Sequence, residues 1–234
     1  MRFTRTSRLI LGAALAAAGF CAAPAQAAKK SPSTKPAALT PEEQEAKYSQ
    51  AISKRADDIL AALDLKDSAK AARVKDIIVN QYRALRDWHD ANDARIKALA
   101  KEPGSDEAKQ IAASRKVLHD QFLSQLSAEL TPEQIETVKD KMTYNKVEVT
   151  YKAYTQIVPD LSEQDKAKIL EFLKQAREEA IDGGSAEEKS TIFKQYKGKI
   201  NNYLDSTGHN VSKAYKDWGQ KQKHANAPAT EPAE

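Results

Sequence analysis

Two histidines and an asparagine could form a polar site inside a helical hairpin of this sequence. His89 and Asn92 fall within a stripe of apolar residues at helical spacing, and His119 lies beyond the turn at Pro103-Gly104. Counted from Pro103, His89 is 14 residues back and His119 is 16 residues forward, so an antiparallel hairpin would bring them to similar heights. Imidazole and amide groups can hold a ligand, bind a metal or transfer a proton.

Three interpretations of this polar core pocket stay open. Polar residues within a helix seam could fix the register of the two helices. They could instead line a ligand pocket, or act as metal ligands or proton-transfer groups. Neither histidine belongs to a metal motif such as His-Glu-x-x-His. We therefore assign no metal and no cofactor from the sequence.

Residues 193–204 are the most distinctive stretch and combine an apolar aromatic face with lysines and asparagines. Aromatic rings can stack on the apolar face of a sugar, amides can bond its hydroxyl groups, and a lysine suits an acidic sugar. Gly198 costs about 1 kcal/mol in a helix interior, which suggests close approach of a ligand or of a neighbouring helix. An ordinary core helix is the alternative.

Three tyrosines on the segment 143–159 form a second candidate recognition surface, which could equally fill a gap between two lobes. Arg177 on the following helix could meet a carboxylate, although arginine–glutamate neighbours are ordinary surface chemistry. The residues predicted to bind a ligand are Tyr144, Tyr151, Tyr154, Arg177, Lys197, Asn201 and Asn202.

Helix caps and apolar periodicity predict the elements that position these residues. Thr131 and Gln134 fit a capping box, in which Leu130 can pack against Ile135. The segment 143–159 alternates apolar and polar residues, so we expect an irregular, extended crossover leading into a short helix at 151–157. The fold class predicted is all-α, a bundle of antiparallel hairpins with about seven helices. They span about 41–63, 67–101, 105–128, 131–142, 162–182, 186–206 and 210–222.

The ends of the chain indicate secretion. Residues 1–27 combine three arginines, a short apolar run and Ala25-Gln26-Ala27, which predicts a signal peptide cleaved after Ala27. The only cysteine, Cys21, leaves with it. We expect a periplasmic or secreted protein with a disordered linker at 28–39, one helical domain at 40–223 and a disordered tail at 224–234. Lobes at 40–142 and 143–223 are an alternative description of that domain.

Charge and motifs narrow the classes of partner. The chain has 37 basic and 33 acidic residues; without the three arginines of the signal peptide, 34 remain against 33. Such a balance argues against a nucleic-acid partner, and after cleavage no apolar run inserts in a membrane. An acidic oligosaccharide and a homodimer remain the expected partners. Gly-x-Ser-x-Gly, Walker and Gly-x-Gly-x-x-Gly motifs are missing, so the sequence leaves enzyme activity open.

Two resemblances extend this picture. Leu130-Thr131-Pro132-Glu133-Gln134 matches the LTxxQ motif of Spy-type periplasmic chaperones, which are helical and cradle unfolded clients. Asp76-Ile77-Ile78, Val149-Thr150-Tyr151-Lys152 and residues 194–204, with further segments, resemble a family of secreted bacterial domains of unknown function. Those domains tend to be encoded beside enzymes of pectin and rhamnogalacturonan utilisation.

The second resemblance covers nearly all of the mature chain and implies an extracytoplasmic accessory or carbohydrate-binding role in the use of acidic plant polysaccharides. It supplies no catalytic residue. The alternatives are a Spy-like chaperone and an undescribed polysaccharide hydrolase or lyase that uses His89 or a tyrosine for proton transfer.

Overall fold

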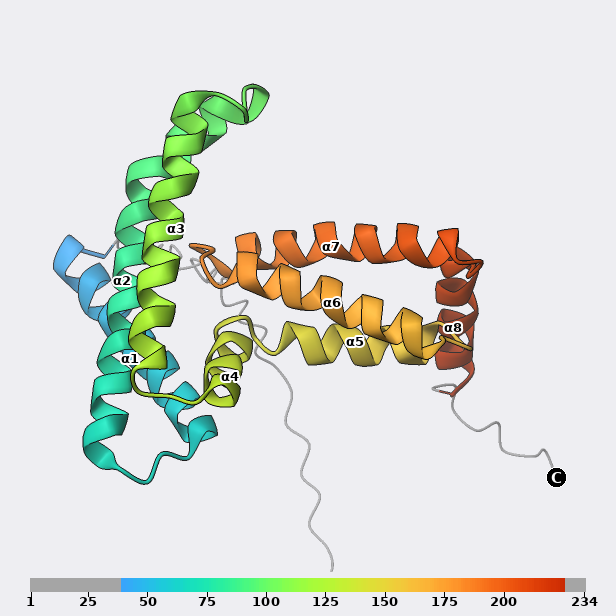
Figure 1. Cartoon of the computed structure of the whole chain (residues 1–234), viewed down its shortest axis with the longest axis horizontal. Coiled ribbons are helices and arrows are strands. Elements are labelled where there is room, and N and C mark those ends of the chain that lie inside the picture. The colour runs from blue at the N-terminus through green and yellow to red at the C-terminus, as the bar shows by residue number, and fades with distance from the viewer. Residues whose placement is uncertain (1–38, 226–234) are drawn as a thin grey trace, which may run out of the picture. The chain divides into compact units, whose positions relative to one another are not determined.

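Helices account for all the long elements of the computed structural model, which describes residues 39–225 (Figure 1). This confirms the predicted all-α fold. The elements are α1 (Pro41–Leu63), α2 (Ser68–Ala98), the short 3-10 helix η1 (Leu99–Lys101), α3 (Asp106–Ser127), α4 (Pro132–Met142), α5 (Lys146–Ile157), α6 (Glu163–Ala180), α7 (Ala186–Ser206) and α8 (Val211–Ala225).

The helix starts follow the capping signals of the sequence. The Thr131 hydroxyl accepts the Gln134 amide and the Gln134 side chain accepts the Thr131 amide, so the predicted capping box is present. The predicted signal peptide, residues 28–38 of the predicted linker and residues 226–234 of the predicted tail lie outside the described residues. Helix α8 continues to Ala225, two residues into that tail.

The stretch expected to be extended belongs mostly to a helix, since α5 begins at Lys146 and includes the short helix predicted at 151–157. Within α5, the buried residues Val147, Thr150, Tyr154 and Ile157 follow a spacing of three, four and three, which is the stripe of an amphipathic helix. The alternation that suggested an extended chain is not an alternation of burial, because Val149 is 63% exposed. The backbone departs from the helix only at the two ends of the segment: Tyr144 and Asn145 have φ of 60° and 53°, and Val158 is extended.

Two hydrophobic clusters hold these helices. One is formed by buried side chains of α1 to α4 together with Leu130, and the other by buried side chains of α5 to α8 and of the α5–α6 connection. Consecutive helices pack closely in the pairs α1–α2, α2–α3, α5–α6 and α6–α7, and α4 also packs on α1 and α6. The connection between α6 and α7, residues 181–185, therefore lies where side chains from both groups of helices meet.

The hairpin of α2 and α3 has a bare end. No residue from Asp90 to Gln110 is buried, whereas His89 and Ile111 on either side are. The apolar stripe of α2 accordingly becomes more exposed toward the C-terminal end of the helix: Ile78 and Leu85 are buried, but Ile96 is 39% exposed. None of the described helices is both long and apolar enough to cross a membrane.

Candidate functional site

Both histidines of the predicted polar pocket contact one residue, Asp182, in the connection between α6 and α7. The His89 Nε2 of α2 lies 2.8 Å from the Asp182 carbonyl oxygen, and the His119 Nδ1 of α3 lies 2.9 Å from Asp182 Oδ2. The sequence predicted that the two rings lie at similar heights along the α2–α3 hairpin. In the structure, both rings bond to the α6–α7 connection. We call His89, His119 and Asp182 the Asp182 junction.

The imidazoles of the junction have protein partners, although His119 and Asp182 also line a cavity of about 330 Å³. His89 is 5% exposed, and its Nδ1 lies 2.8 Å from Asp93 Oδ1. Because a carbonyl and a carboxylate only accept, both His89 nitrogens must carry a proton for both bonds to form. A Cβ added at Gly184 would lie 2.8 Å from two atoms of the His89 ring. The backbone of Gly184 thus lies against that face of the imidazole and leaves no room for a ligand there.

The other members of the predicted pocket also have protein partners. The Asn92 side chain donates to the Trp88 carbonyl one turn earlier on α2, at 2.8 Å. Hydrogen bonding to Asp182 raises the pKa of His119, against the opposing effect of burial. Among the described residues, no three His, Cys, Asp or Glu side chains gather in a way that could hold a metal ion. The geometry favours the register interpretation of this pocket.

Arg177, a predicted ligand-binding residue, is enclosed by carboxylates of the protein itself. It is 2% exposed and donates to Glu136, Asp140 and Glu178. Burial alone would lower the pKa of its guanidinium, but the hydrogen bonds to Asp140 and Glu136 raise it. Its charge is thus neutralised where α6 meets α4, and its burial keeps the guanidinium from a ligand in solution.

The predicted residues of α5 and α7 meet each other but form no open cleft. The Tyr154 hydroxyl is 2.6 Å from Asn201 Oδ1 and 3.2 Å from the Lys197 carbonyl, and Tyr154 is 1% exposed. The Lys197 and Asn202 side chains are exposed, and Tyr151 packs partly buried on the α5–α8 cluster. No neighbouring helix approaches Gly198 closely, since a Cβ there would meet nothing within 4 Å among the described residues; the close helix packing suggested for this glycine is absent. The structure does not bring the seven predicted residues into one site.

One predicted tyrosine, Tyr144, lines a cavity of about 290 Å³ that the sequence did not reveal. Helix α1 contributes two residues seven apart, and α2 contributes three from adjacent turns. The rest come from the turn before α5, from the α6–α7 connection and from the start of α7. We call it the tyrosine–arginine cavity. Its lining residues are Tyr48, Arg55, Tyr82, Leu85, Arg86, Tyr144, Gly183, Gly184, Ser185, Ala186 and Lys189.

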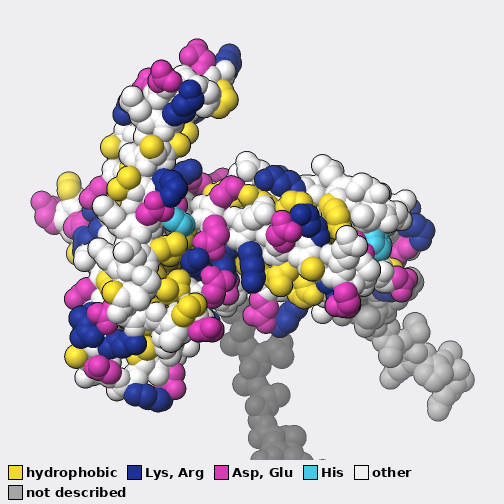
Figure 2. Space-filling view, in the orientation of Figure 1, with side chains coloured by type: hydrophobic (Ala, Val, Ile, Leu, Met, Phe, Trp, Pro, Cys, Tyr) yellow, Lys and Arg dark blue, Asp and Glu magenta, His cyan; other side chains and the backbone are white. Residues whose placement is uncertain are grey.

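The charged side chains that line this cavity are all basic. Three of its lining residues are basic and none is acidic, although basic and acidic side chains are interspersed over the face shown in Figure 2. Arg86 is bound to Glu45 at 2.6 Å. Arg55 has no ion pair with any described residue and lies 5.8 Å from the Tyr82 ring centroid. Arg55 can therefore meet an anion at no cost in broken ion pairs.

The tyrosines give the cavity rigid aromatic walls. The Tyr48 hydroxyl donates to the Tyr82 carbonyl at 2.8 Å, and the Arg86 guanidinium lies 4.3 Å from the Tyr48 ring centroid. The Tyr82 hydroxyl makes no hydrogen bond within the described part of the chain, and burial raises its pKa to about 12. Tyr82 thus stays a neutral donor at ordinary pH, available to a ligand oxygen.

Tyr144 is held at the cavity by a strained backbone. It is 46% exposed, and its φ of 60° is a left-handed conformation that costs a non-glycine residue roughly 1–2 kcal/mol. Glycine is the usual residue where a helix ends in this way. A large exposed ring at such a position contributes little to packing, which points to a role for it outside the hydrophobic core.

Lys189 forms the closed end of the cavity. Its ammonium donates to the carbonyl oxygens of Met142 and Ile181, at 3.2 and 3.1 Å, and so ties the ends of α4 and α6 to α7. Burial lowers its pKa to about 8. Both hydrogen bonds favour the charged form, and at neutral pH most of the lysine is protonated. The cavity therefore keeps its positive charge.

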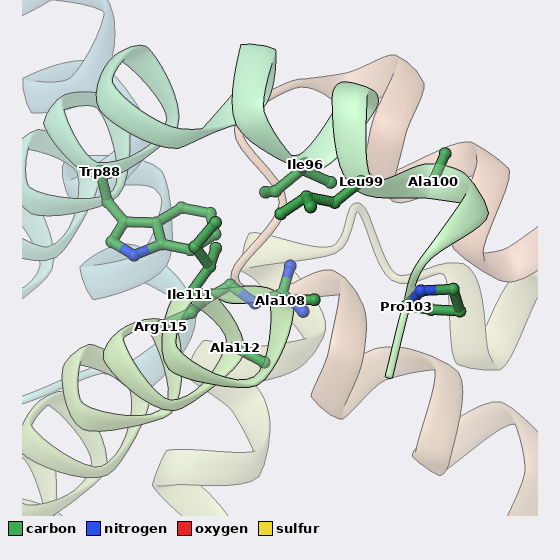
Figure 3. Close-up of a pocket in the computed structure, with 9 residues that line it drawn as sticks. All are labelled: Trp88, Ile96, Leu99, Ala100, Pro103, Ala108, Ile111, Ala112 and Arg115. Atoms are coloured by element: carbon green, nitrogen blue, oxygen red, sulfur yellow. The ribbon is translucent and has the colours of Figure 1, made fainter. Parts of the chain in front are cut away.

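The groove between α2 and α3 differs in character. It has a volume of about 220 Å³ and lies at the bare end of the hairpin. Figure 3 shows Trp88, Ile96 and Leu99 facing the α3 residues Ala108, Ile111 and Arg115. Arg115 is its only charged residue and lies 5.5 Å from the Trp88 ring centroid. This groove offers apolar contact but few groups that could orient a polar ligand.

Comparison with protein families gives one result for this chain. A family described as protein of unknown function (DUF3826) matches residues 49–224. The chain belongs to the DUF3826 family. No curated protein matches it. The DUF3826 region begins within α1 and ends in α8, so it includes every residue of the tyrosine–arginine cavity except Tyr48. This membership agrees with the expected uncharacterised domain family and assigns no activity.

Sequence reasoning missed most of the cavity of this DUF3826 protein. No functional role was predicted from the sequence for Tyr48, Arg55, Tyr82, Arg86 or Lys189. A usable signal was present on α1, because Tyr48 and Arg55 are seven residues apart and so share one helix face. Their meeting with Tyr144 and Lys189 depends on tertiary packing, which that spacing does not reveal.

Proposed function

We propose that this protein binds an acidic oligosaccharide, as an extracytoplasmic accessory component of polysaccharide use. The observation that carries this proposal is a cavity with three tyrosines and three basic residues but no acidic one. A uronic acid presents a carboxylate beside an apolar ring face and hydroxyl groups. Arg55 would bind the carboxylate, the tyrosine rings would stack on the sugar, and the Tyr82 hydroxyl would bond a sugar oxygen.

Binding accounts for the cavity better than turnover does. Lys189 is the cavity residue whose pKa of about 8 would suit proton transfer near neutral pH. Its ammonium, however, is engaged by two backbone carbonyls, so a proton lost there would break contacts that join three helices. The predicted signal peptide and the resemblance to secreted domains near pectin-use genes support an extracytoplasmic role.

A Spy-like chaperone has less support from the described residues. Such a protein needs a contiguous apolar surface for unfolded clients, but Leu130 of the LTxxQ motif is buried at 6% exposure. The large apolar side chains that are exposed come from separate elements and include Ile96, Val117 and Val149. We therefore prefer the saccharide proposal.

A thermal-shift and calorimetric comparison tests the proposal. The mature protein is titrated with oligogalacturonides and with neutral glucans of equal length. A ligand at 100 times its dissociation constant should add about 2.7 kcal/mol to the free energy of unfolding. We expect the acidic oligosaccharides to stabilise the protein more than neutral glucans of equal length do. Equal shifts with neutral glucans, or no shift with any acidic saccharide, would contradict the proposal.

Matched variants on α1 locate the binding. Arg55→Met removes an exposed cavity cation that forms no ion pair within the described residues. Lys47→Met removes an exposed cation that likewise forms no such ion pair but does not line the cavity. We expect Arg55→Met to weaken binding about tenfold or more and Lys47→Met to leave it unchanged. Equal effects of the two substitutions would indicate general charge attraction instead of a site.

A further inference from the structure

A second cavity lies between the α5–α6 connection, the α7–α8 connection and one face of α8. It has a volume of about 350 Å³ and contains none of the ligand-binding residues expected from the sequence. We call it the Trp218 groove. Its α8 residues, Lys213, Ala214, Asp217, Trp218 and Lys221, recur every three or four positions and so occupy one helix face.

Trp218 provides a fixed aromatic surface in this groove. It is partly buried and packs against the α5–α8 hydrophobic cluster, which holds the ring in place. Its indole N–H makes no hydrogen bond within the described residues. An indole with one face packed and a free donor is suited to a ligand that offers both an apolar face and an acceptor oxygen.

Polar side chains with unused hydrogen-bonding capacity surround the indole. Gln156, Asp160 and Lys221 line the groove and make no hydrogen bond or ion pair with any other described residue. Asp160 has a φ of 60°, a left-handed conformation that aspartate adopts more readily than most residues. The remaining polar groups are engaged: Lys213 pairs with Asp217 at 2.6 Å, and His209 lies 3.2 Å from Asp165 Oδ2.

The charge of the groove distinguishes it from the tyrosine–arginine cavity. Asp160 and Asp217 balance Lys213 and Lys221, so a free anion gains little there and meets an unpaired carboxylate. A neutral ligand with many hydroxyl groups can use Asp160 and Gln156 as acceptors and Gln156, Lys221 and the Trp218 N–H as donors. We propose that the Trp218 groove is a second binding site, specific for the ring of a neutral pyranose stacked on Trp218.

Fluorescence of Trp218 tests this proposal directly. The chain contains two tryptophans, so Trp88→Phe leaves Trp218 as the single indole. We expect a saturable change of its emission with at least one member of a panel of neutral methyl pyranosides, and none with glycerol, which lacks a ring. Should Trp88→Phe fail to fold, the wild-type chain is titrated and Trp218→Phe supplies the background signal.

Substitutions then separate the groove from the first cavity. By calorimetry, Trp218→Ala should weaken binding of the neutral sugar about tenfold or more, and Asp160→Asn should weaken it as well. Lys216→Ala, an exposed residue of α8 outside the groove, and Arg55→Met should leave it unchanged. Because the first cavity is tested with acidic oligosaccharides, either proposal can fail alone.

Two results would overturn the second site. One is that no neutral pyranoside changes the Trp218 emission saturably and that any neutral-sugar binding seen by calorimetry is unaffected by Trp218→Ala. The other is tighter binding of methyl galacturonate than of its neutral counterpart at Trp218, which would contradict the charge balance from which the neutral ligand is inferred.

Discussion

Two arginines of this chain show how differently the same side chain can be used. Arg177 is 2% exposed and bound to three carboxylates, while Arg55 is exposed and has no ion pair among the described residues. A buried cation must be neutralised by the protein because water cannot solvate it. An exposed cation beside aromatic rings is free to meet an anion from solution. The comparison teaches that a candidate binding residue is better identified by its missing partner than by its type.

Exchanging each arginine for methionine is the strongest test of this comparison. Arg177→Met leaves Asp140 without its cation, and leaves Glu136 and Glu178 with Lys139 as their remaining partner, so we expect a loss of about 3 kcal/mol in the free energy of unfolding. Arg55→Met should change that free energy by less than about 0.5 kcal/mol. Chemical denaturation of both variants measures the difference. Similar losses in the two proteins would break the distinction between a structural and a ligand-facing arginine.

Two glycines extend the same contrast to packing. Gly184→Ala would place a Cβ 2.8 Å from the His89 ring, so we expect a loss of about 2 kcal/mol from overpacking at the Asp182 junction. Gly198→Ala meets nothing within 4 Å and should stabilise α7 by about 1 kcal/mol. Melting temperatures of the two variants should therefore move in opposite directions. A stabilised Gly184→Ala protein would show that the junction is looser than its geometry indicates.

The pH dependence of stability sharpens the description of the junction. Because the folded-state pKa of His119 is raised above its usual value of 6.5 by Asp182, protonated His119 stabilises the folded state fully at pH values below 6.5. That stability is lost as pH rises through the folded pKa. The wild-type protein should therefore have a higher free energy of unfolding than His119→Gln. We expect this difference to be about 1 kcal/mol larger in acid than in mild base.

Denaturation of both proteins across this pH range measures the difference. Lys116→Gln, an exposed neighbour on α3, serves as control and should show no such trend. A gap between wild type and His119→Gln that does not vary with pH would mean that the bond to Asp182 carries no charge.

The smallest expected effect separates stability from binding at Tyr144. Glycine accepts a φ of 60° without strain, but it also loses more entropy on folding. The net gain from Tyr144→Gly should therefore be about 0.5 kcal/mol. We expect the same variant to bind oligogalacturonides more weakly, since one aromatic wall of the cavity is gone. Thermal denaturation measures the gain in stability, and calorimetry on the same preparation measures the loss of affinity. Unchanged affinity would remove Tyr144 from the proposed site.

The sequence predicts the helices of this protein well because their signals are local. The caps at Thr40, Thr131, Ser162 and Ser185 each depend on residues within one turn, and all four are present. The sequence predicts the helix at 151–157 but starts it too late, because an accidental alternation of Val147, Val149 and Tyr151 hid the helical stripe that ends at Ile157. Local pattern alone could not decide which of these side chains would be covered.

The candidate sites were far less predictable because they depend on which helices meet. Arg177 and Tyr154 are of the residue types found in sugar sites, yet both bond to the protein itself. Arg177 donates to Asp140 of α4, and the Tyr154 hydroxyl donates to Asn201 of α7. Asp182 joins two histidines from a connection 93 residues away from His89. Single-sequence reasoning identified the chemically capable residues, but it could not tell which of them the fold would leave unsatisfied.

The bare end of the α2–α3 hairpin has a consequence for how the chain can be altered. From Asp90 to Gln110 no side chain is buried, and Gly104 at the turn has open space around it. Backbone amides there should exchange with solvent through local opening that leaves both hydrophobic clusters intact. Such a turn is also a natural point for added length. A reporter domain inserted at Gly104 would be displayed on the protein while both proposed sites stay undisturbed.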